Sequence, residues 1–219
     1  MERPQQAITV QVQFPAIWLD EGDEFRRLAG YDVCLRAFRC HNFSSISPDH
    51  ANAQGNRCST IGTDWDEGCP HCSFWADNFN GIGVHLNHRD VTFVAISRAE
   101  LSKIKSFKKR MGWSFKWVSS FQSDFNFDYQ ASFTPEEVHS GAAFYNYTRM
   151  DTYDTDREGI SVFYKDESGA VFHTYSCYAR GIDMMNGTYH YLDLVPKGRD
   201  EEGLEGPQDW VRYHDRYED

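Results

Sequence analysis

Residues 91–96 read Val-Thr-Phe-Val-Ala-Ile, an almost continuous apolar run of strand-forming residues. A run of this kind is typical of a strand that is covered on both faces, as in the middle of a sheet. Amphipathic segments flank it on both sides, one starting at Cys69 and the other covering about 98–111. A buried strand between two amphipathic helices predicts an α/β sandwich.

The first of these helices is predicted to start at Cys69, because Pro70 suits the first helical position. Apolar side chains then recur at helical spacing, and Gly81 and Gly83 are expected to end the helix. The apolar stripe consists of Cys72, Trp75, Ala76 and Phe79.

For the second helix, Ser97 and Glu100 have the spacing of a capping box. The C-terminal half of this helix is basic, which complements the helix dipole. In an acidic chain, we interpret this basic cluster as a solvated face rather than an anion site. Its members are Lys103, Lys105, Lys108, Lys109 and Arg110.

Two strands are predicted further on, over 160–165 and 170–178, around a hairpin turn of sequence Asp-Glu-Ser-Gly. The stretch 180–192 is expected to be partly helical, with Gly187 interrupting it. The tail from Lys197 is acidic and loop-like.

The N-terminal 60 residues differ from the rest. Residues 8–14 alternate apolar and polar side chains and predict one short strand, and residues 31–38 are a weaker strand candidate. Residues 41–60 are rich in Ser, Asn and Asp and predict a loop. We therefore divide the chain into an atypical, partly irregular extension (1–60) and a folded domain (61–219).

Bulk composition narrows the function. A net charge of −11 argues against a nucleic-acid partner, which would require clustered Lys and Arg. No apolar stretch approaches 18 residues, so no membrane partner is expected, and the N-terminus lacks the apolar core of a secretory signal. Six cysteines are few for a disulfide-stapled scaffold of 219 residues. These features predict a cytoplasmic protein in a reducing setting.

Residues 69–72 read Cys-Pro-His-Cys, which is the strongest chemical motif in the chain. The reactive form of cysteine is the thiolate, and a helix N-terminus favours it through unpaired backbone N–H groups. We expect Cys69 to be the accessible nucleophile and Cys72, the first member of the buried stripe, to be the resolving thiol.

Neighbouring charges are expected to tune the pair. A partly protonated His71 would stabilise a thiolate, whereas Asp66 and Glu67 would disfavour a second anion nearby. Pro70 fixes the start of the helix between the two thiols. These opposing effects leave the redox potential open.

Other interpretations of the motif remain. Cys69 and Cys72 with His85 and His88 approach the spacing of a zinc finger, although the two histidines are one residue too close. We expect the protein to use neither a cofactor nor a metal. A purely structural cysteine pair is a further possibility, and the roles of the other cysteines stay open. These are Cys34, Cys40, Cys58 and Cys177, the last expected to be a small buried hydrophobe.

Residues 64–79 read Asp-Trp-Asp-Glu-Gly-Cys-Pro-His-Cys-Ser-Phe-Trp-Ala-Asp-Asn-Phe, and residues 172–181 read Phe-His-Thr-Tyr-Ser-Cys-Tyr-Ala-Arg-Gly. With these segments and others in order, residues 62–219 resemble the DUF899 family of thioredoxin-like proteins, which are described as predicted dithiol–disulfide oxidoreductases. The other matching segments are 94–98, 107–113, 117–126, 161–164 and 187–194.

The resemblance implies a thioredoxin-like three-layer α/β/α sandwich with a mixed central sheet, and Cys69 and Cys72 as its redox pair. The implied partners are a disulfide or thiol substrate and a cellular reductant. Trp65, Gly159 and Ile160 are candidates for facing the substrate. The alternative function is a non-catalytic thioredoxin-like protein that binds a ligand or partner through its aromatic segment 113–129.

Two features depart from the pattern that the resemblance implies. Family members carry an apolar strand just before the Asp-Trp loop, whereas residues 54–62 make a poor strand here. We therefore expect the sheet to be compromised or rebuilt at that place. The turn at 158–161, where thioredoxins have a proline facing the cysteines, reads Glu-Gly-Ile-Ser. The missing proline counts against protein disulfides as substrates.

Overall fold

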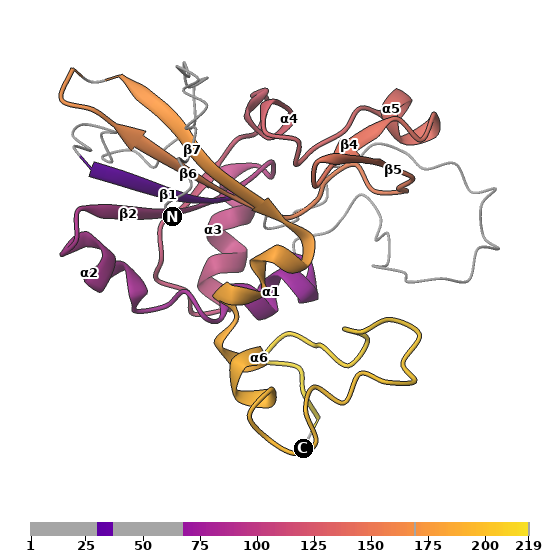
Figure 1. Cartoon of the computed structure of the whole chain (residues 1–219). Helices are drawn as coiled ribbons and strands as arrows, with labels where there is room; N and C mark the ends of the chain where they lie inside the picture. The colour runs from indigo at the N-terminus through magenta and orange to yellow at the C-terminus, as the bar shows by residue number, and fades with distance from the viewer. Residues whose placement is uncertain (1–29, 37–67, 169, 219) are drawn as a thin grey trace, which may run out of the picture.

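A five-stranded sheet organises the protein (Figure 1). The computed structural model describes residues 30–36, for which only the backbone is considered, together with 68–168 and 170–218. The strand order is β3-β2-β1-β6-β7. The strands are β1 (Gly30–Arg36), β2 (Val91–Ser97), β3 (Trp117–Ser119), β6 (Gly159–Lys165) and β7 (Val171–Tyr178).

The sheet contains both parallel and antiparallel pairs. β1 runs parallel to β2, and β2 runs parallel to β3. On its other side β1 is antiparallel to β6, which forms a hairpin with β7. The predicted strands at 91–96, 160–165 and 170–178 are therefore confirmed, each within one residue of its expected bounds.

The central strand comes from the N-terminal part of the chain. β1 lies between β2 and β6, so the weak strand candidate at 31–38 occupies the middle of the sheet. A segment within residues 1–60 thus supplies the central strand of the described sheet. The poor strand at 54–62 and the predicted strand at 8–14 lie outside the described residues.

Two helices follow Cys69 where one was expected. α1 (Pro70–Ala76) starts as predicted, with Pro70 at its first position. Gly81, at φ 85°, ends no helix but forms the N-cap of a second helix, α2 (Ile82–Asn87), which contains Gly83. A positive φ is readily adopted only by glycine, so the chain can turn there and resume a helix.

The helix predicted at 98–111 is α3 (Leu101–Arg110), but its predicted capping box is wrong. Glu100 is the N-cap and makes no side-chain cap hydrogen bond, whereas the Ser97 hydroxyl accepts a hydrogen bond from Trp117 Nε1 at 3.0 Å. A capping box does occur at α5 (Pro135–His139), where Thr134 and Glu137 bond each other's backbone N–H groups.

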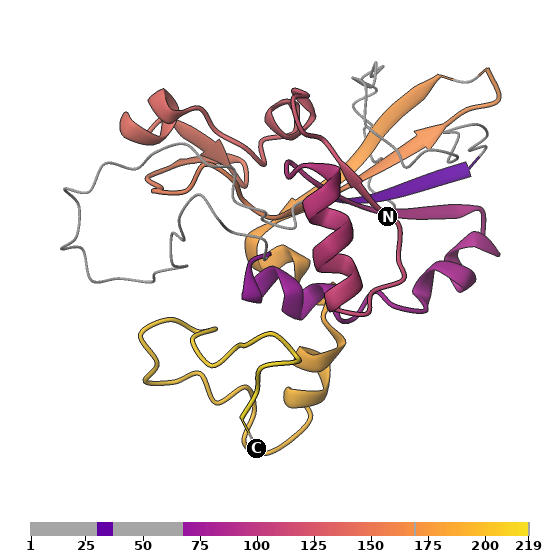
Figure 2. The ribbon, with the colours of Figure 1, turned by 180° about the vertical axis from the view of Figure 1, so that it is seen from behind.

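The two faces of the sheet are covered unequally (Figures 1 and 2). Phe93 and Ala95 point into the larger core, which they share with side chains of α1 and α3, whereas Val94 and Ile96 point to the opposite face. Among the described residues, that opposite face is covered by the short helix α4 (Phe125–Asp128). The expected full second helical layer is therefore not found in this part of the chain.

The remaining elements follow α5 and β7 in the chain. A small hairpin of β4 (Ala143–Tyr145) and β5 (Thr148–Met150) follows α5. After β7 the chain forms a 3-10 helix, η1 (Ala179–Met185), and then α6 (Gly187–Leu192). The side-chain oxygen of Asn186 caps α6 by accepting from Thr188 N and Tyr189 N, so Gly187 opens this helix.

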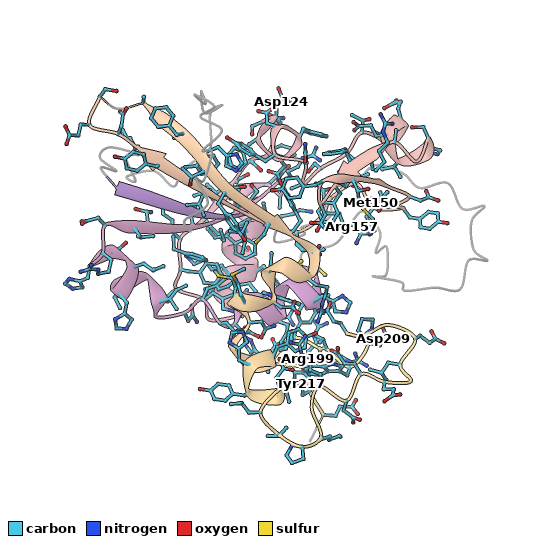
Figure 3. The ribbon with its side chains drawn as sticks, viewed as in Figure 1. Asp124, Met150, Arg157, Arg199, Asp209 and Tyr217 are labelled. Atoms are coloured by element: carbon cyan, nitrogen blue, oxygen red, sulfur yellow. The ribbon has the colours of Figure 1, made fainter. Side chains whose placement is uncertain are left out.

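The C-terminal segment, residues 193–218, lies beneath α1 and beside α6 (Figures 1 and 2). Figure 3 marks it by the side chains of Arg199, Asp209 and Tyr217. It has no helix or strand within its described residues, as predicted, yet Val211 and Tyr213 are buried in the core. No helix in the described ranges combines the length and apolarity that crossing a membrane requires.

Candidate functional site

Cys69 and Cys72 both lie at the first turn of α1. Cys69 is the N-cap residue, with an extended backbone (φ −66°, ψ 132°), and Cys72 is at the third helical position. The Cys69 carbonyl accepts hydrogen bonds from Ser73 N at 2.9 Å and Ser73 Oγ at 2.8 Å. The two cysteines are thus three positions apart at the start of α1.

The exposures of the two cysteines reverse the sequence-based expectation. Cys69, expected to be accessible, is 3% exposed, whereas Cys72 is half-buried at the edge of the core. Cys72 is a free thiol. The apolar stripe is otherwise correct, because Trp75, Ala76 and Phe79 are buried in the core beneath the sheet.

The residue before Cys69 is held from two sides. A Cβ on Gly68 would lie 2.8 Å from Phe107 Cε1, so only glycine fits without a shift. The Tyr213 hydroxyl, 145 positions later in the chain, donates a short hydrogen bond to the Gly68 carbonyl oxygen. Sequence reasoning missed this role of Tyr213, since no local pattern connects the tail to residue 68.

The far end of α1 is fixed as well. Trp75 Nε1 donates to the carbonyl of Ile182 in η1 at 3.1 Å. Asp77, the C-cap residue, accepts from Trp113 Nε1 at 2.8 Å and lies 2.7 Å from His214 Nδ1. The helix that carries the cysteines is therefore anchored to η1, to the aromatic segment after α3 and to the C-terminal segment.

The expected tuning and substrate-facing residues are only partly described. Pro70 and His71 are half-buried on the first turn of α1, beside the thiols. Trp65, Asp66 and Glu67 lie outside the described residues.

Gly159 and Ile160 are buried rather than open to a substrate. A Cβ on Gly159 would lie 2.8 Å from Tyr178 Cδ1, and Ile160 is 4% exposed within the core. The packing of Tyr178 favours glycine at residue 159, since a side chain there would collide with that ring, and residues 159–161 begin strand β6 instead of forming the expected turn.

A third thiol borders the same core. Cys177, on β7, pairs across the sheet with Ile160 and is half-buried, where full burial was expected. Burial raises the pKa of the Cys177 thiol, and a hydrogen bond with Tyr175 opposes this in part. Cys177 is therefore a weaker nucleophile near neutral pH than an ordinary thiol.

The zinc alternative requires Cys69, Cys72, His85 and His88 to converge, and all four are described. His85 and His88 are exposed on α2 and at its C-cap. Within the described ranges, no three or more His, Cys, Asp or Glu side chains are grouped as metal ligands. The structure does not bring the four residues together as one site.

The aromatic segment 113–129 is mostly core. Trp113, Phe115 and Trp117 pack in the larger core with side chains of α1 and α3, each no more than 7% exposed. Phe125 and Tyr129 pack on the other face of the sheet. These side chains stabilise the two sides of the sheet, which disfavours their role as a ligand cage.

Comparison with known proteins identifies the family. The family described as "Bacterial protein of unknown function (DUF899)" matches residues 59–217. The chain belongs to this family. The match begins ten residues before Cys69 and runs through most of the C-terminal segment, so both the helix that carries Cys72 and the tail that contacts it lie within the DUF899 region.

No curated protein matches this DUF899 member. Among solved structures, a crystal structure of a PrxQ cysteine-to-serine mutant from Xylella fastidiosa is similar, at 10% sequence identity and a TM-score of 0.37. The similarity covers 74% of this chain and 78% of that one. This degree of likeness is too low to define a shared fold.

Proposed function

We propose that the protein is a thiol–disulfide oxidoreductase of thioredoxin-like fold that uses Cys69 and Cys72 as its redox pair. The supporting observation is their placement as the N-cap and third residue of α1. Two cysteines on the first turn of one helix can close a disulfide without rearranging distant parts of the chain. The proposal extends to the three-layer arrangement that the resemblance implies.

In the proposed reaction the Cys69 thiolate attacks one sulfur of a substrate disulfide. A mixed disulfide forms, and the other substrate sulfur leaves as a thiolate that takes up a proton. The Cys72 thiolate then attacks the Cys69 sulfur and releases the second half of the substrate as a thiol. The resulting Cys69–Cys72 disulfide is returned to two thiols by a cellular dithiol or thiol reductant, which is oxidised in turn. We place this chemistry in the cytoplasm.

The order of attack is supported by the N-cap position of Cys69, where backbone N–H groups of the first turn favour a thiolate. The low exposure of Cys69 makes the reverse order, with the half-buried Cys72 attacking first, the competing assignment. Trapping the mixed disulfide distinguishes the two orders. The single variant that lacks the resolving thiol accumulates the intermediate, whereas the one that lacks the nucleophile does not.

The test measures the reduction of insulin disulfides and of a small aromatic disulfide by the full chain. Wild type should be active, and Cys69→Ser and Cys72→Ser should each lose turnover. The matched control is Cys177→Ser, which removes a half-buried thiol on β7 and should retain the turnover of wild type. Equal turnover in wild type and the Cys69→Ser/Cys72→Ser double variant would overturn the proposal. With Cys72→Ser, mass spectrometry should find the substrate half attached to Cys69.

A further inference from the structure

Three consecutive residues of the C-terminal segment, Tyr213, His214 and Asp215, contact both ends of α1 and the neighbouring helix α3. We name residues 213–215 the C-terminal strap. Tyr213 donates to the Gly68 carbonyl before α1, and His214 Nδ1 lies 2.7 Å from Asp77 Oδ1 at the end of α1. Asp215 binds Arg110 of α3.

We propose that Tyr213 is a positioning residue of the redox pair, which fixes the Gly68–Cys69 peptide so that Cys69 is held in register with Cys72. This inference rests on the proposed function. Tyr213 is far from Cys69 in the sequence. It contacts the carbonyl of Gly68, the residue before Cys69, and the proposal gives it a role in the redox chemistry.

The contact is geometrically defined. Tyr213 is 5% exposed, and its ring packs edge-on against Phe107 with centroids 5.9 Å apart. Phe107 also occupies the place where a side chain on Gly68 would be. The glycine backbone is therefore held between a ring that sets its distance from α3 and a hydroxyl that sets the direction of its carbonyl.

The strap is itself fastened to α3. Arg110 donates through Nε and through Nη2 to the two carboxylate oxygens of Asp215, at 2.9 Å in each case. The Arg110 guanidinium also lies over the Tyr213 ring, 4.9 Å from its centroid. A paired, planar guanidinium gives a directional contact, so the Tyr213 ring has little freedom to turn its hydroxyl away from Gly68.

The consequence concerns the closing of the disulfide. A disulfide tolerates a narrow range of geometries, and two groups held in that range react as if at a high effective concentration. Without the Tyr213 hydroxyl, the Gly68–Cys69 peptide gains orientations that are unsuited to closing the ring. The equilibrium constant for forming the Cys69–Cys72 disulfide then falls, because the reduced state gains conformational freedom that the oxidised state does not share.

The experiment equilibrates the full-length protein with mixtures of reduced and oxidised glutathione. One oxidised glutathione converts the two protein thiols to a disulfide and leaves as two reduced glutathiones. Differential alkylation with peptide mass mapping reports the Cys69–Cys72 disulfide separately from other cysteines. The variant is Tyr213→Phe, which removes the hydroxyl and keeps the ring. The matched control is Tyr217→Phe, which removes the hydroxyl that accepts from Arg212 N in the same segment.

We expect Tyr213→Phe to lower the equilibrium constant about fivefold, the equivalent of one net hydrogen bond, and Tyr217→Phe to leave it unchanged. An unchanged constant in Tyr213→Phe, or an equal fall in both variants, overturns the positioning role. If the wild-type disulfide never forms, the proposed function itself fails, which is a different outcome. If Tyr213→Phe does not fold, the Asp215→Asn variant is measured instead. This change weakens the attachment of the strap to Arg110 and should lower the equilibrium constant by a smaller factor.

Discussion

Gly68 lies so close to Phe107 that a Cβ on the glycine would sit 2.8 Å from the ring. This contact places the backbone next to Cys69 directly against α3. The start of the cysteine helix is thus set by packing against a second helix and by the motif together. A side chain at residue 68 would have to push the ring, the peptide or both.

Gly68→Ala should therefore destabilise the fold by about 1–3 kcal/mol, the usual cost of overpacking a filled core. Urea unfolding monitored by tryptophan fluorescence measures the change. Gly83→Ala is the matched control, because its Cβ would meet nothing within 4 Å and the residue lies inside α2. That change should be neutral or stabilising by up to about 1 kcal/mol. Equal effects of the two substitutions would contradict the close contact.

Val33→Pro tests the central position of β1. Val33 pairs with Phe93 on one side and Val162 on the other, so its strand has hydrogen-bonded neighbours on both edges. Proline removes a backbone donor and is tolerated only at sheet edges. We expect loss of cooperative thermal unfolding by circular dichroism, whereas Val33→Ile should retain it. A Val33→Pro variant with wild-type unfolding would show that the sheet does not depend on this strand.

Asp156 holds a nearly buried ion pair. Its carboxylate accepts from Arg98 Nη1 at 3.2 Å and from the hydroxyls of Ser132 and Thr155. Asp156→Ala would leave the Arg98 guanidinium without this counter-charge, so we expect a loss of about 3 kcal/mol in chemical denaturation.

The control for this change is Asp154→Ala, which breaks the more exposed pair with Arg157, and it should cost less than about 1 kcal/mol. Comparable losses in the two variants would argue against a special role for the buried pair.

Acid should weaken the attachment of the C-terminal strap. Hydrogen bonds from Arg110 lower the pKa of Asp215 below its usual value. The folded state therefore binds the proton less readily than the unfolded state, and the stabilisation is present at neutral pH. It is lost as the pH falls below the usual carboxyl pKa and through the lowered one.

Because the pair is partly exposed, its contribution is below about 1 kcal/mol. The difference in melting temperature between wild type and Asp215→Asn should shrink between pH 7 and pH 3. A difference that stays constant over this range would mean that the pair contributes nothing to the pH dependence.

Cys177 should react slowly with alkylating reagents near neutral pH. Burial raises the pKa of its thiol, so the thiolate fraction is small at pH 7 and rises with pH. Iodoacetamide labelling from pH 7 to 9.5, followed by peptide mass mapping, measures the labelling rate of Cys177. This rate should rise more steeply and at higher pH in the folded protein than in urea. Identical profiles in both states would show that the fold does not perturb this thiol.

Local patterns predict some of the regular elements, but not α2 or the small hairpin of β4 and β5. The apolar run of β2, the proline that opens α1 and the turn between β6 and β7 are each specified by residues a few positions apart. The capping box at Ser97 failed because the Ser97 hydroxyl is taken by Trp117, which lies on the neighbouring strand. A spacing rule cannot include a competitor that only folding brings close.

The sequence by itself determined that a helix would start at the two cysteines, since Pro70 and the apolar stripe act within one or two turns. Only the tertiary structure decided which segment fills the centre of the sheet and how exposed each thiol is. β1 takes its place through pairing with β2 and β6, far along the chain. Cys69 is buried in an environment to which α3 and Tyr213 contribute through Gly68. Such contacts join residues that are far apart in the sequence, and neither side-chain periodicity nor local propensity records them.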